Sequence, residues 1–526
     1  MARREALGLE FSTQSVKAIL VDIDGGQVTG TAQMSFDEAF PEYKTEGGVL
    51  PAEDPAVRHT SPSMVLEALD RIFEQLRQEG ADLGSLRALK VDAQQHCSVY
   101  ADASLSERLQ ALETSHPLVE QIAPAFTRSS APIWEDRSTA EEVAMLEEQL
   151  RDAGGLIALT GNRGERRFPA AQIVKWAREA PESYDATSHV LVLSAFLSSV
   201  LAGRVAPVDT GDGWGTNLNT LDIKTPGWNR RVIEAVDALV RSGGATTSVA
   251  EKLGGIDHYD APIGRIHPYF AHKYGINEQA TVLCGTGDNP ATLLGTGGRL
   301  VISLGSSYTV NGPVDDPKPS PDAEYNIFGY TPGRAMALSV ITNGAKLHDE
   351  FKRRYVSSGS WEEYRELAGA TPVAADEPLM LPYLQEESVP QAPAGIRRDG
   401  FDEADAAANV RALHVSQALS LRLHSAHLSN VDSFAVVGGG SRNPVLRQML
   451  TDAFGAPSYL IEKGDFAAPL GCAIAAARHV LDVPYEDAAD RFVEVQQGSR
   501  MEPDTSLTPV YRELQERYRK LEQGQA

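Results

Sequence analysis

Residues 8–22 read GLEFSTQSVKAILVD, and this stretch decides the fold class. Apolar residues alternate in its second part, and the polar turn Ser12–Ser15 separates that part from an apolar beginning. Alternation with a period of two is typical of β-strands, so the stretch predicts two strands joined by a turn. A turn at Asp24–Gly26 and the segment 27–34 extend the prediction to a three-stranded meander. A helix is expected to follow from about Ser61, because an amphipathic apolar pattern begins there.

The same plan returns about 290 residues later, where residues 298–312 read GRLVISLGSSYTVNG. This stretch again predicts a strand, a turn of small hydroxyl residues and a strand. Residues 434–455 then predict a strand, a glycine turn and a helix in which Asn443 is the N-cap and Pro444 the first helical residue. A strand over 457–463 and a helix over 467–481 follow. The repeat predicts two related α/β domains that face a cleft.

The predicted domain boundary lies between residues 278 and 279, where a crossover segment is expected. The two predicted domains are therefore residues 1–278 and 279–526. The last helix, about residues 507–526, is charged and amphipathic. We expect this helix to be structural. Packing back on the N-terminal domain is the alternative.

Composition excludes several classes of protein. The chain has 526 residues and a net charge of -24, which argues against nucleic acid or acidic membranes as main partners. Three cysteines (Cys97, Cys284 and Cys472) are far apart and suit neither a metal site nor a disulfide framework, which favours the cytoplasm. The beginning of the chain does not resemble a signal peptide. The most apolar stretch, 190–203, is too short to span a bilayer and is expected to be a buried helix.

One charged residue stands inside a glycine-rich turn. Asp288 lies in GTGDNPATLLGTG (285–297), directly after the apolar strand ATVLC. With Asn289 as an N-cap and Pro290 as the first helical residue, Asp288 would lie at the start of a helix. The positive end of a helix favours an ionised carboxylate. An ordinary turn aspartate is the alternative interpretation of the motif taken alone.

Two turns are candidates for binding phosphate, although the sequence contains neither a Walker A motif nor the protein-kinase motifs. They are Ser12–Ser15 and Gly305–Ser307, which offer backbone N–H groups and hydroxyls with little steric bulk. Each alone could be an ordinary hairpin turn. Their matching places in the two halves favour a shared function. The glycines of 438–440 would let a flat ligand approach the backbone.

Polar side chains also gather where the strand over about 86–93 is expected to end. Gln94, Gln95 and His96 follow that strand, and amides and an imidazole can hydrogen-bond the hydroxyls of a polyol. A single histidine is more often an ordinary surface or core residue. The segments WEDRST (134–139) and GERRF (164–168) add aromatic and charged groups.

Taken in order along the chain, these motifs resemble the FGGY family of carbohydrate kinases, and within it the xylulose kinases of the animal type. The resemblance rests on GLEFSTQSVKAILVD, FPEYKTEGGV, QQH with SVY, IWEDRST, ERRF, PVDTGDGWGTNL, GTGDNPATL, SLGSSYTV and GGGSRN. It covers most of the chain. It implies an α/β fold of two actin-like (ribonuclease H-like) domains with a deep interdomain cleft, and an enzyme that uses ATP and Mg²⁺. It also implies that the N-terminal domain (1–278) binds the sugar and that the C-terminal domain (279–526) binds ATP.

The resemblance also implies roles for individual residues. Asp288 matches the catalytic base, and Glu10 matches a position near the metal where the family usually has Asp. The residues that match sugar-binding positions are Gln95, His96, Arg167 and Asn289. The residues that match nucleotide-binding positions are Thr13, Gly305, Ser306, Ser307, Trp361, Gly439, Gly440 and Asn443. Gly-Ser-Ser stands at 305–307 where the family commonly has Gly-Thr-Ser, and the hydroxyl is retained.

The expected reaction is transfer of the γ-phosphoryl group of MgATP to a primary hydroxyl of a ketopentose, with D-xylulose giving D-xylulose 5-phosphate. A kinase for another polyol or ketose, such as ribulose or xylitol, is an alternative. A catalytically silent sugar-sensing protein on the same fold is another, and Glu10 is the residue that favours it. The expected partners are a small sugar and ATP, without nucleic acid or membrane. A homodimer is compatible with the sequence.

Overall fold

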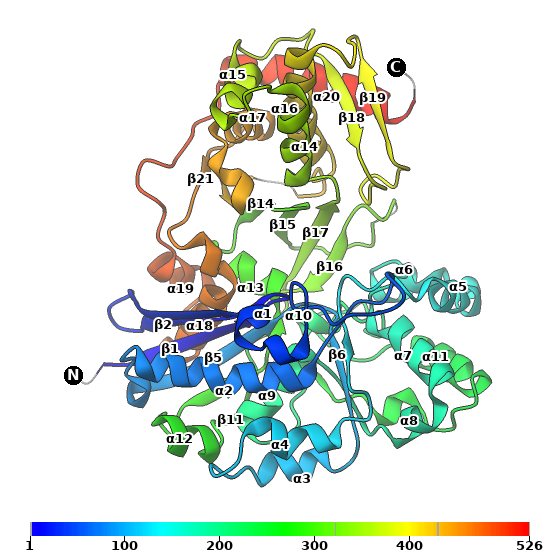
Figure 1. Cartoon of the computed structure of the whole chain (residues 1–526), viewed down its shortest axis with the longest axis vertical. Helices are drawn as coiled ribbons and strands as arrows, with labels where there is room; N and C mark the ends of the chain where they lie inside the picture. The colour runs from blue at the N-terminus through cyan, green and yellow to red at the C-terminus, as the bar shows by residue number, and fades with distance from the viewer. Residues whose placement is uncertain (1–2, 321, 429–430, 525–526) are drawn as a thin grey trace. The chain divides into compact units, whose positions relative to one another are not determined.

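The computed structural model describes residues 3–320, 322–428 and 431–524, which form two compact units (Figure 1). The first unit contains the chain up to Gly298, together with Asp315–Met336 and Phe466–Phe492. The second contains Arg299–Val314, Ala337–Asp465 and the residues from Val493 on. The compact units therefore divide near Gly298 rather than at 278/279. The reason is that β12 (Thr281–Leu283) pairs with a strand of the first unit.

A seven-stranded sheet forms the centre of the first unit, in the order β11-β12-β5-β1-β2-β3, with β13 also paired to β5. Strand β1 is antiparallel to β2 and parallel to β5, and β5 is parallel to β12. The predicted meander is confirmed. The strands are β1 (Glu5–Phe11), β2 (Ser15–Asp22), β3 (Val28–Ser35), β5 (Leu86–Ala93), β11 (Pro262–Arg265), β12 and β13 (Thr286–Gly287).

Helices cover both faces of this sheet. Leu7 and Leu9 of β1 join the core that includes the buried side of α2 (Pro62–Gln78). This helix begins where the sequence predicts, and Ser61 is its N-cap. Side chains alternate along a strand, so Gly8 faces the other way, toward α18 (Ala467–Leu481). A Cβ at Gly8 would lie 1.8 Å from the backbone oxygen of Pro469. Only glycine allows the helix to approach the strand this closely.

Helix α13 (Asp288–Gly295) packs on α18 backbone to backbone. A Cβ at Gly295 would lie 1.7 Å from the oxygen of Ala467, and one at Gly471 would lie 1.9 Å from the oxygen of Ala291. Each helix therefore supplies a glycine at the point where the other comes closest. This reciprocal contact fixes the helix that begins with Asp288.

A second core of the first unit lies among α5, α6, α7 and α11, away from the main sheet (Figure 1). The predicted helix over 190–203 is confirmed only in part, because its first three residues belong to strand β8, which pairs with β6. The elements are α5 (Ala140–Gln149), α6 (Gly155–Thr160), α7 (Pro169–Glu179), α11 (Arg230–Ser242), β6 (Ser98–Ala101), β8 (His189–Val192) and α9 (Leu193–Ala202).

The second unit repeats the strand order of the first, with the strands in the order β17-β15-β14-β20-β21. Strand β14 is antiparallel to β15 and parallel to β20, as β1 is to β2 and β5. This repeat confirms the predicted mixed α/β fold with two related halves. The strands are β14 (Leu300–Leu304), β15 (Tyr308–Val314), β17 (Ala335–Ile341), β20 (Phe434–Val437) and β21 (Ser458–Tyr459). Strand β21 is shorter than the predicted strand over 457–463.

Four helices gather beside this sheet, and α16 contacts the other three (Figure 1). They are α14 (Ala345–Tyr355), α15 (Trp361–Gly369), α16 (Ala406–Leu423) and α17 (Pro444–Phe454). The last helix, α20 (Thr508–Glu522), belongs to this second unit, where it packs on α16 and β18 (Leu379–Tyr383). Its side chains Tyr511, Leu514 and Tyr518 are buried, which fits this packing. Over the described ranges, helices with the length and apolar character needed to cross a membrane are absent.

Candidate active site

The end of β5 carries three of the polar residues singled out in the sequence. Gln94 Oε1 accepts a hydrogen bond from Thr13 Oγ1 at 3.1 Å, and the indole Nε1 of Trp134 donates to the same hydroxyl at 2.9 Å. The first candidate phosphate turn is therefore held by the QQH motif on one side and by an exposed tryptophan on the other. The ring of Trp134 is 42% exposed, so it is accessible to a ligand.

Gln95 connects this strand end to the candidate base. Its Oε1 accepts from Asn289 Nδ2 at 2.8 Å, and the same Asn289 nitrogen lies 3.0 Å from Oδ1 of Asp288. Gln95 Nε2 donates to the backbone oxygen of Gly211. A Cβ at Gly287 would lie 2.4 Å from Cγ of Gln95, so the glycine before Asp288 is required for this contact.

The start of the helix differs by two residues from its predicted position. Helix α13 begins at Asp288, with Gly287 in extended geometry (φ -74, ψ 155) as its N-cap. Asn289 is therefore not the N-cap and Pro290 is not the first helical residue. Asn289 directs its amide to Gln95 and Asp288 instead of capping the helix. The prediction that Asp288 lies at a helix N-terminus holds.

The electrostatic surroundings of Asp288 suit a general base. Burial, and then the charge of Glu10, raise the pKa of Asp288 to about 7, while backbone N–H groups of Asn289 and Gln95 oppose this rise. Its side chain nevertheless stays partly exposed. A base works best when its pKa is close to the working pH, so this carboxylate can take a proton near neutrality.

Glu10 and Asp92 face each other in register on the neighbouring strands β1 and β5. Oε2 of Glu10 lies 3.0 Å from Nζ of Lys17, and Oδ2 of Asp92 accepts from the thiol of Cys472 at 3.4 Å. Oδ1 of Asp92 is buried and accepts no hydrogen bond from the described residues. Burial, and then the charges of Glu10 and Asp288, raise the pKa of Asp92 well above its usual range.

These carboxylates fit Mg²⁺ in donor type, because Mg²⁺ prefers hard oxygen ligands. Groups of three or more acidic, histidine or cysteine side chains placed to hold a metal are absent from the described part of the chain. Mg²⁺ commonly uses one or two protein carboxylates and takes its other ligands from water and substrate phosphates. Glu10 can supply such a carboxylate, so the residues are compatible with the ion when phosphate is also bound.

His96 is held in one tautomer and one orientation. Its Nδ1 lies 2.8 Å from the backbone oxygen of Gly215, and because a carbonyl only accepts, Nδ1 carries the proton. The imidazole stacks on Phe168 with 4.3 Å between ring centroids. Burial, and then the charge of Arg167, lower its pKa well below the usual value. The neutral ring therefore presents Nε2 as an acceptor for a ligand hydroxyl, from a backbone with φ 70.

Arg167 belongs to the same group of side chains. Its guanidinium lies 5.9 Å from the ring centre of Phe168, and its Nη2 lies 4.0 Å from Oε2 of Glu165. Glu165 is also paired with Arg163 at 2.7 Å. Phe168 thus contacts two of the four predicted sugar-binding residues, His96 through stacking and Arg167 through a cation–π contact.

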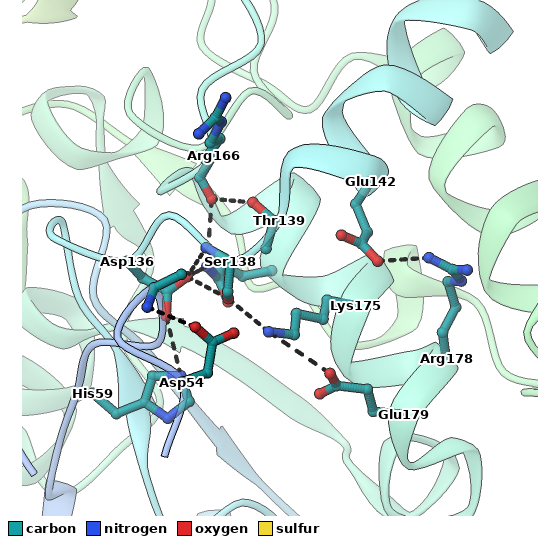
Figure 2. A network of polar contacts seen from close by, with 12 residues as sticks. Asp54, His59, Asp136, Ser138, Thr139, Glu142, Arg166, Lys175, Arg178 and Glu179 are labelled. Atoms are coloured by element: carbon teal, nitrogen blue, oxygen red, sulfur yellow. Dashed lines mark hydrogen bonds and ion pairs between the residues drawn. The ribbon is translucent and has the colours of Figure 1, made fainter. Parts of the chain in front are cut away.

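The loop that carries Arg167 is fastened by a network around Asp136, shown in Figure 2. Oδ1 of this fully buried carboxylate accepts from the backbone N–H of Ser138 at 3.0 Å and from Gln172 Nε2 at 2.8 Å. Gln172 and the hydroxyl of Thr139 both donate to the backbone oxygen of Arg166. The residue before Arg167 is thereby fixed from two directions.

The remaining predicted residues belong to the second unit, where two turns meet at the end of β14. Gly305–Ser307 joins β14 to β15, and its Gly305 oxygen accepts from the backbone N–H of Ala345 at 3.0 Å. A Cβ at Gly440 would lie 2.8 Å from Cβ of Leu304, which directly precedes this turn. A Cβ at Gly439 would meet no described atom within 4 Å, so the backbone there is open to a ligand.

Asn443 and Trp361 complete this group. Asn443 is the N-cap of α17, as predicted, and its side-chain oxygen accepts from the N–H groups of Val445 and Leu446. Trp361 is the first residue of α15, is 39% exposed and lies edge-on to Tyr364. Open glycine backbone, an exposed indole and an asparagine amide together fit a nucleoside.

Three residues of the first unit have no individual role among the sequence predictions, although the segments 134–139 and 164–168 contain two of them. Phe168 contacts His96 and Arg167, Trp134 contacts Thr13, and Asp92 lies beside Glu10. Asp92 had a local signal, because a charged residue inside the apolar strand over 86–93 is unusual. The other two contacts join residues far apart in the chain and have no local signal.

The chain matches known families over both halves. Residues 128–295 match the N-terminal domain of the FGGY family of carbohydrate kinases, and residues 300–480 match the C-terminal domain of that family. The chain is 31% identical to the xylulose kinase of Rattus norvegicus, over 99% of this chain and 97% of that one. These matches define a carbohydrate kinase, an enzyme that phosphorylates sugars.

The chain therefore belongs to the FGGY family of carbohydrate kinases. Solved structures share its fold. The structure of a xyloylose kinase from Brucella ovis matches with a TM-score of 0.80 and 23% identity, covering 98% of both chains. A gluconate kinase from Lactobacillus acidophilus matches with a TM-score of 0.81 and 16% identity, covering 99% of this chain and 98% of that one. Proteins named for different sugars thus share this fold, so the fold alone does not identify the sugar.

Proposed function

We propose that the protein is an ATP-dependent xylulose kinase. It transfers the γ-phosphoryl group of ATP to a primary hydroxyl of D-xylulose and forms D-xylulose 5-phosphate. The similarity to the rat xylulose kinase over nearly the whole chain supports this choice of sugar. The QQH motif supports it as well, because it offers hydrogen-bonding groups for several hydroxyls in a row.

In this proposal the sugar is bound by the first unit. His96 Nε2 accepts a hydrogen bond from one hydroxyl, and Arg167 donates to sugar oxygens. Gln95 and Asn289 hold each other through their amides, and Nδ2 of Asn289 also donates to Oδ1 of Asp288, so in this proposal Asn289 offers its amide oxygen to a sugar hydroxyl. Phe168 supplies apolar surface beside His96 and Arg167.

Asp288 accepts the proton from the primary hydroxyl of the sugar as that oxygen attacks the γ-phosphorus of ATP. A new oxygen–phosphorus bond forms, the bond to the β–γ bridging oxygen breaks, and ADP leaves with that electron pair. Positioned base catalysis is typically worth about 10² to 10⁴ in rate. Alignment and charge stabilisation provide most of the rest, because phosphoryl transfer needs little covalent help from the protein.

In this proposal one set of residues binds the nucleoside of ATP and a second set binds its phosphates. Trp361, Gly439, Gly440 and Asn443 hold the nucleoside, and the turns at Thr13 and Gly305–Ser307 hold phosphate oxygens. Mg²⁺ is the expected cofactor, which would neutralise phosphate charge, and Glu10 would hold it directly or through water. The chain's own contribution is to orient the ligands and to exclude water from the reacting atoms.

The observation that carries the proposal is the environment of Asp288. It is a carboxylate with a pKa of about 7 at the first residue of a helix, linked through Asn289 and Gln95 to the strand end with His96.

Buried free cysteines at 97, 284 and 472 support the expected cytoplasmic location.

The test is ADP release with MgATP across D-xylulose, D-ribulose, xylitol, glycerol and gluconate. We expect the highest kcat/KM with D-xylulose, and we expect the Asp288→Asn variant to release almost no ADP. A clear preference for ribulose or xylitol would favour the alternative substrate. Sugar binding by calorimetry without ADP release from any compound would favour a silent sugar sensor.

A further inference from the structure

Two buried histidines in the second unit have no part in the proposed chemistry. His348 of α14 is 5% exposed and His414 of α16 is fully buried, and their rings lie 4.7 Å apart at an angle of 74°. Burial lowers the pKa of His348 to about 4. Burial, and then the neighbouring His348, lower the pKa of His414 well below its usual value. Both rings are therefore neutral, so each has one donor and one acceptor nitrogen.

The hydrogen bonds of His414 determine the orientation of Asn443. Nδ1 of His414 lies 2.8 Å from the backbone oxygen of Val410, which can only accept, so Nδ1 carries the proton. Nε2 must then be an acceptor, and it lies 2.9 Å from Nδ2 of Asn443. The amide oxygen of Asn443 consequently faces α17, where it accepts from Val445 and Leu446. One N–H of the amide is left for a ligand.

The bonds of His348 lead to the second phosphate turn. Gln417 Nε2 donates to the backbone oxygen of Asn343 at 3.1 Å, so its Oε1 faces His348 and accepts from Nε2 at 2.7 Å. Nδ1 of His348 then accepts from the hydroxyl of Tyr364 at 2.8 Å. The backbone after Asn343 lies directly under the turn, because a Cβ at Gly344 would lie 2.7 Å from the oxygen of Ser306.

Tyr364 accepts contacts from three sides of this cluster: its hydroxyl bonds His348, and its ring lies beside His414 and beside the exposed indole of Trp361. Its ring is fully buried, with 5.2 Å between its centroid and that of His414 and 5.5 Å between its centroid and that of Trp361. These four side chains, His348, Tyr364, His414 and Gln417, thus contact Asn443, Trp361 and the backbone of Asn343 beneath the Gly305–Ser307 turn. We call these four side chains the imidazole relay.

We propose that the imidazole relay positions the nucleotide-binding groups, with His414 setting the amide of Asn443 and Gln417 setting the backbone beneath the Gly305–Ser307 turn. The proposal rests on the proposed function, since it takes Asn443 and this turn as nucleotide contacts. These side chains are positioning residues and do not touch the reacting atoms. Loss of one of them should weaken nucleotide binding and leave sugar binding unchanged.

The main test uses His414→Phe, which keeps a ring but removes the acceptor for Asn443. Binding of MgADP to the full chain is measured by calorimetry, and KM values are measured for ATP and D-xylulose. We expect Kd for MgADP and KM for ATP to rise about threefold to tenfold, as for one lost hydrogen bond, with KM for the sugar unchanged. His414→Gln can offer an acceptor again and should recover most of the affinity.

His424→Phe is the matched control. His424 is a buried imidazole at the end of the same helix, bonded to Glu522 of α20 at 3.2 Å and away from the nucleotide elements. It should lower Tm without changing Kd for MgADP. If His414→Phe lowers Tm as much and leaves Kd for MgADP unchanged, the relay is only structural and the proposal is overturned.

Two further variants extend the test, and the first of them also serves if His414→Phe folds poorly. Tyr364→Phe removes one hydroxyl from the relay and retains the packing against Trp361, and we expect a rise in Kd of about twofold to threefold. Asn443→Asp keeps the helix cap but loses the donor to His414, so its effect and that of His414→Phe should not add. Full additivity would contradict a shared bond. If the unaltered protein binds neither MgADP nor MgATP, the proposed function fails first, independently of the relay.

Discussion

Nδ2 of Asn289 lies 2.8 Å from Oε1 of Gln95, which ties the residue after the candidate base to the strand end that carries His96. The two segments meet because β13 pairs with the end of β5, with Gly287 opposite Ala93. The parallel pairing brings the strand ends to the same edge of the sheet. The position of the candidate base relative to the sugar-binding residues is therefore set by the sheet and not by a mobile loop.

The first prediction concerns the Asp288→Asn variant. The amide has the shape of the carboxylate but cannot take the proton of the sugar hydroxyl, so kcat should fall at least about a hundredfold. Steady-state assays of ADP release check this, with Asp70→Asn as the control. Asp70 is a carboxylate of the same unit that bonds the hydroxyls of Tyr269 and Tyr274. Its loss should affect stability rather than turnover.

The Asp288→Asn variant should also be more stable than the unaltered protein at about pH 8. The folded-state pKa of Asp288 is raised to about 7, so this group lowers the free energy of unfolding progressively as the pH rises above its unfolded-state pKa, and the full cost is present above about pH 7. This cost decreases as the pH falls and is absent once the group is protonated in both states. Thermal unfolding at about pH 8 and at about pH 5 should show a larger gain in Tm for Asp288→Asn at the higher pH. A lower Tm at both would contradict the electrostatic origin of the shift.

The second prediction is the pH dependence of the reaction. A base with a pKa of about 7 keeps its proton in more acidic solution, so kcat/KM for the sugar should fall about tenfold per pH unit below that value. Assays between about pH 5.5 and about pH 9 should give an acid limb near pH 7. A flat profile down to about pH 5 would mean that Asp288 is ionised throughout and that its environment is not as described.

The third prediction is that His96→Ala weakens sugar binding selectively. The neutral imidazole has one acceptor free for a sugar hydroxyl, and its loss should raise KM for D-xylulose about threefold to tenfold without changing KM for ATP. His189→Ala is a suitable control, because His189 is half-buried in the same unit and bonds Ser106 at 3.3 Å. A larger effect on ATP than on sugar would remove His96 from the sugar site.

Much of the fold could be predicted from local pattern. The strand, hydroxyl turn and strand of 8–22 and 298–312 were predicted correctly, because alternation and turn composition are local properties. The cap at Asn443 was also predicted, since a cap depends on two or three neighbouring residues. The start of α13 was misplaced because Asn289 bonds to Gln95, a partner 194 residues away.

The parts of the candidate site that escaped prediction depend on distant partners. His96 stacks on Phe168, and α18 joins the first unit although it follows most of the second in the chain. The close approach of α18 to β1 requires Gly8, but a glycine in a strand can equally mark a bulge or a sharp bend. Such contacts are set by tertiary packing, which a single sequence does not reveal.

The fourth prediction tests Glu10 as a ligand of Mg²⁺. Removal of the ion with EDTA should stop the reaction, and Glu10→Gln should raise the Mg²⁺ concentration for half-maximal rate at least about tenfold, because an amide oxygen is a weaker ligand. Glu10→Asp keeps the charge and should stay close to the unaltered protein. Titration of MgCl₂ at fixed ATP is the measurement. Equal Mg²⁺ dependence in all three proteins would exclude a role for this carboxylate in holding the metal.

The fifth prediction concerns Asp136, the centre of the network in Figure 2. Burial alone would raise its pKa, but hydrogen bonds from His59 and Ser138 and from the backbone N–H of Arg58 lower it below the usual value. The ionised form is thus stabilised by folding, and this stabilisation is present above the unfolded-state pKa and lost only in strong acid. Asp136→Ala leaves these donors without an acceptor and should cost about 1–3 kcal/mol of unfolding free energy.

Asp136→Ala should also raise KM for D-xylulose and leave KM for ATP unchanged. The reason is that Gln172, bonded to Asp136 at 2.8 Å, also donates to the backbone oxygen of Arg166, next to Arg167. Glu142→Gln is the control, because Glu142 pairs with Arg178 at 2.6 Å at the edge of the same network without reaching Arg166. If both variants lose stability and neither changes KM for the sugar, the network supports the fold but does not position Arg167.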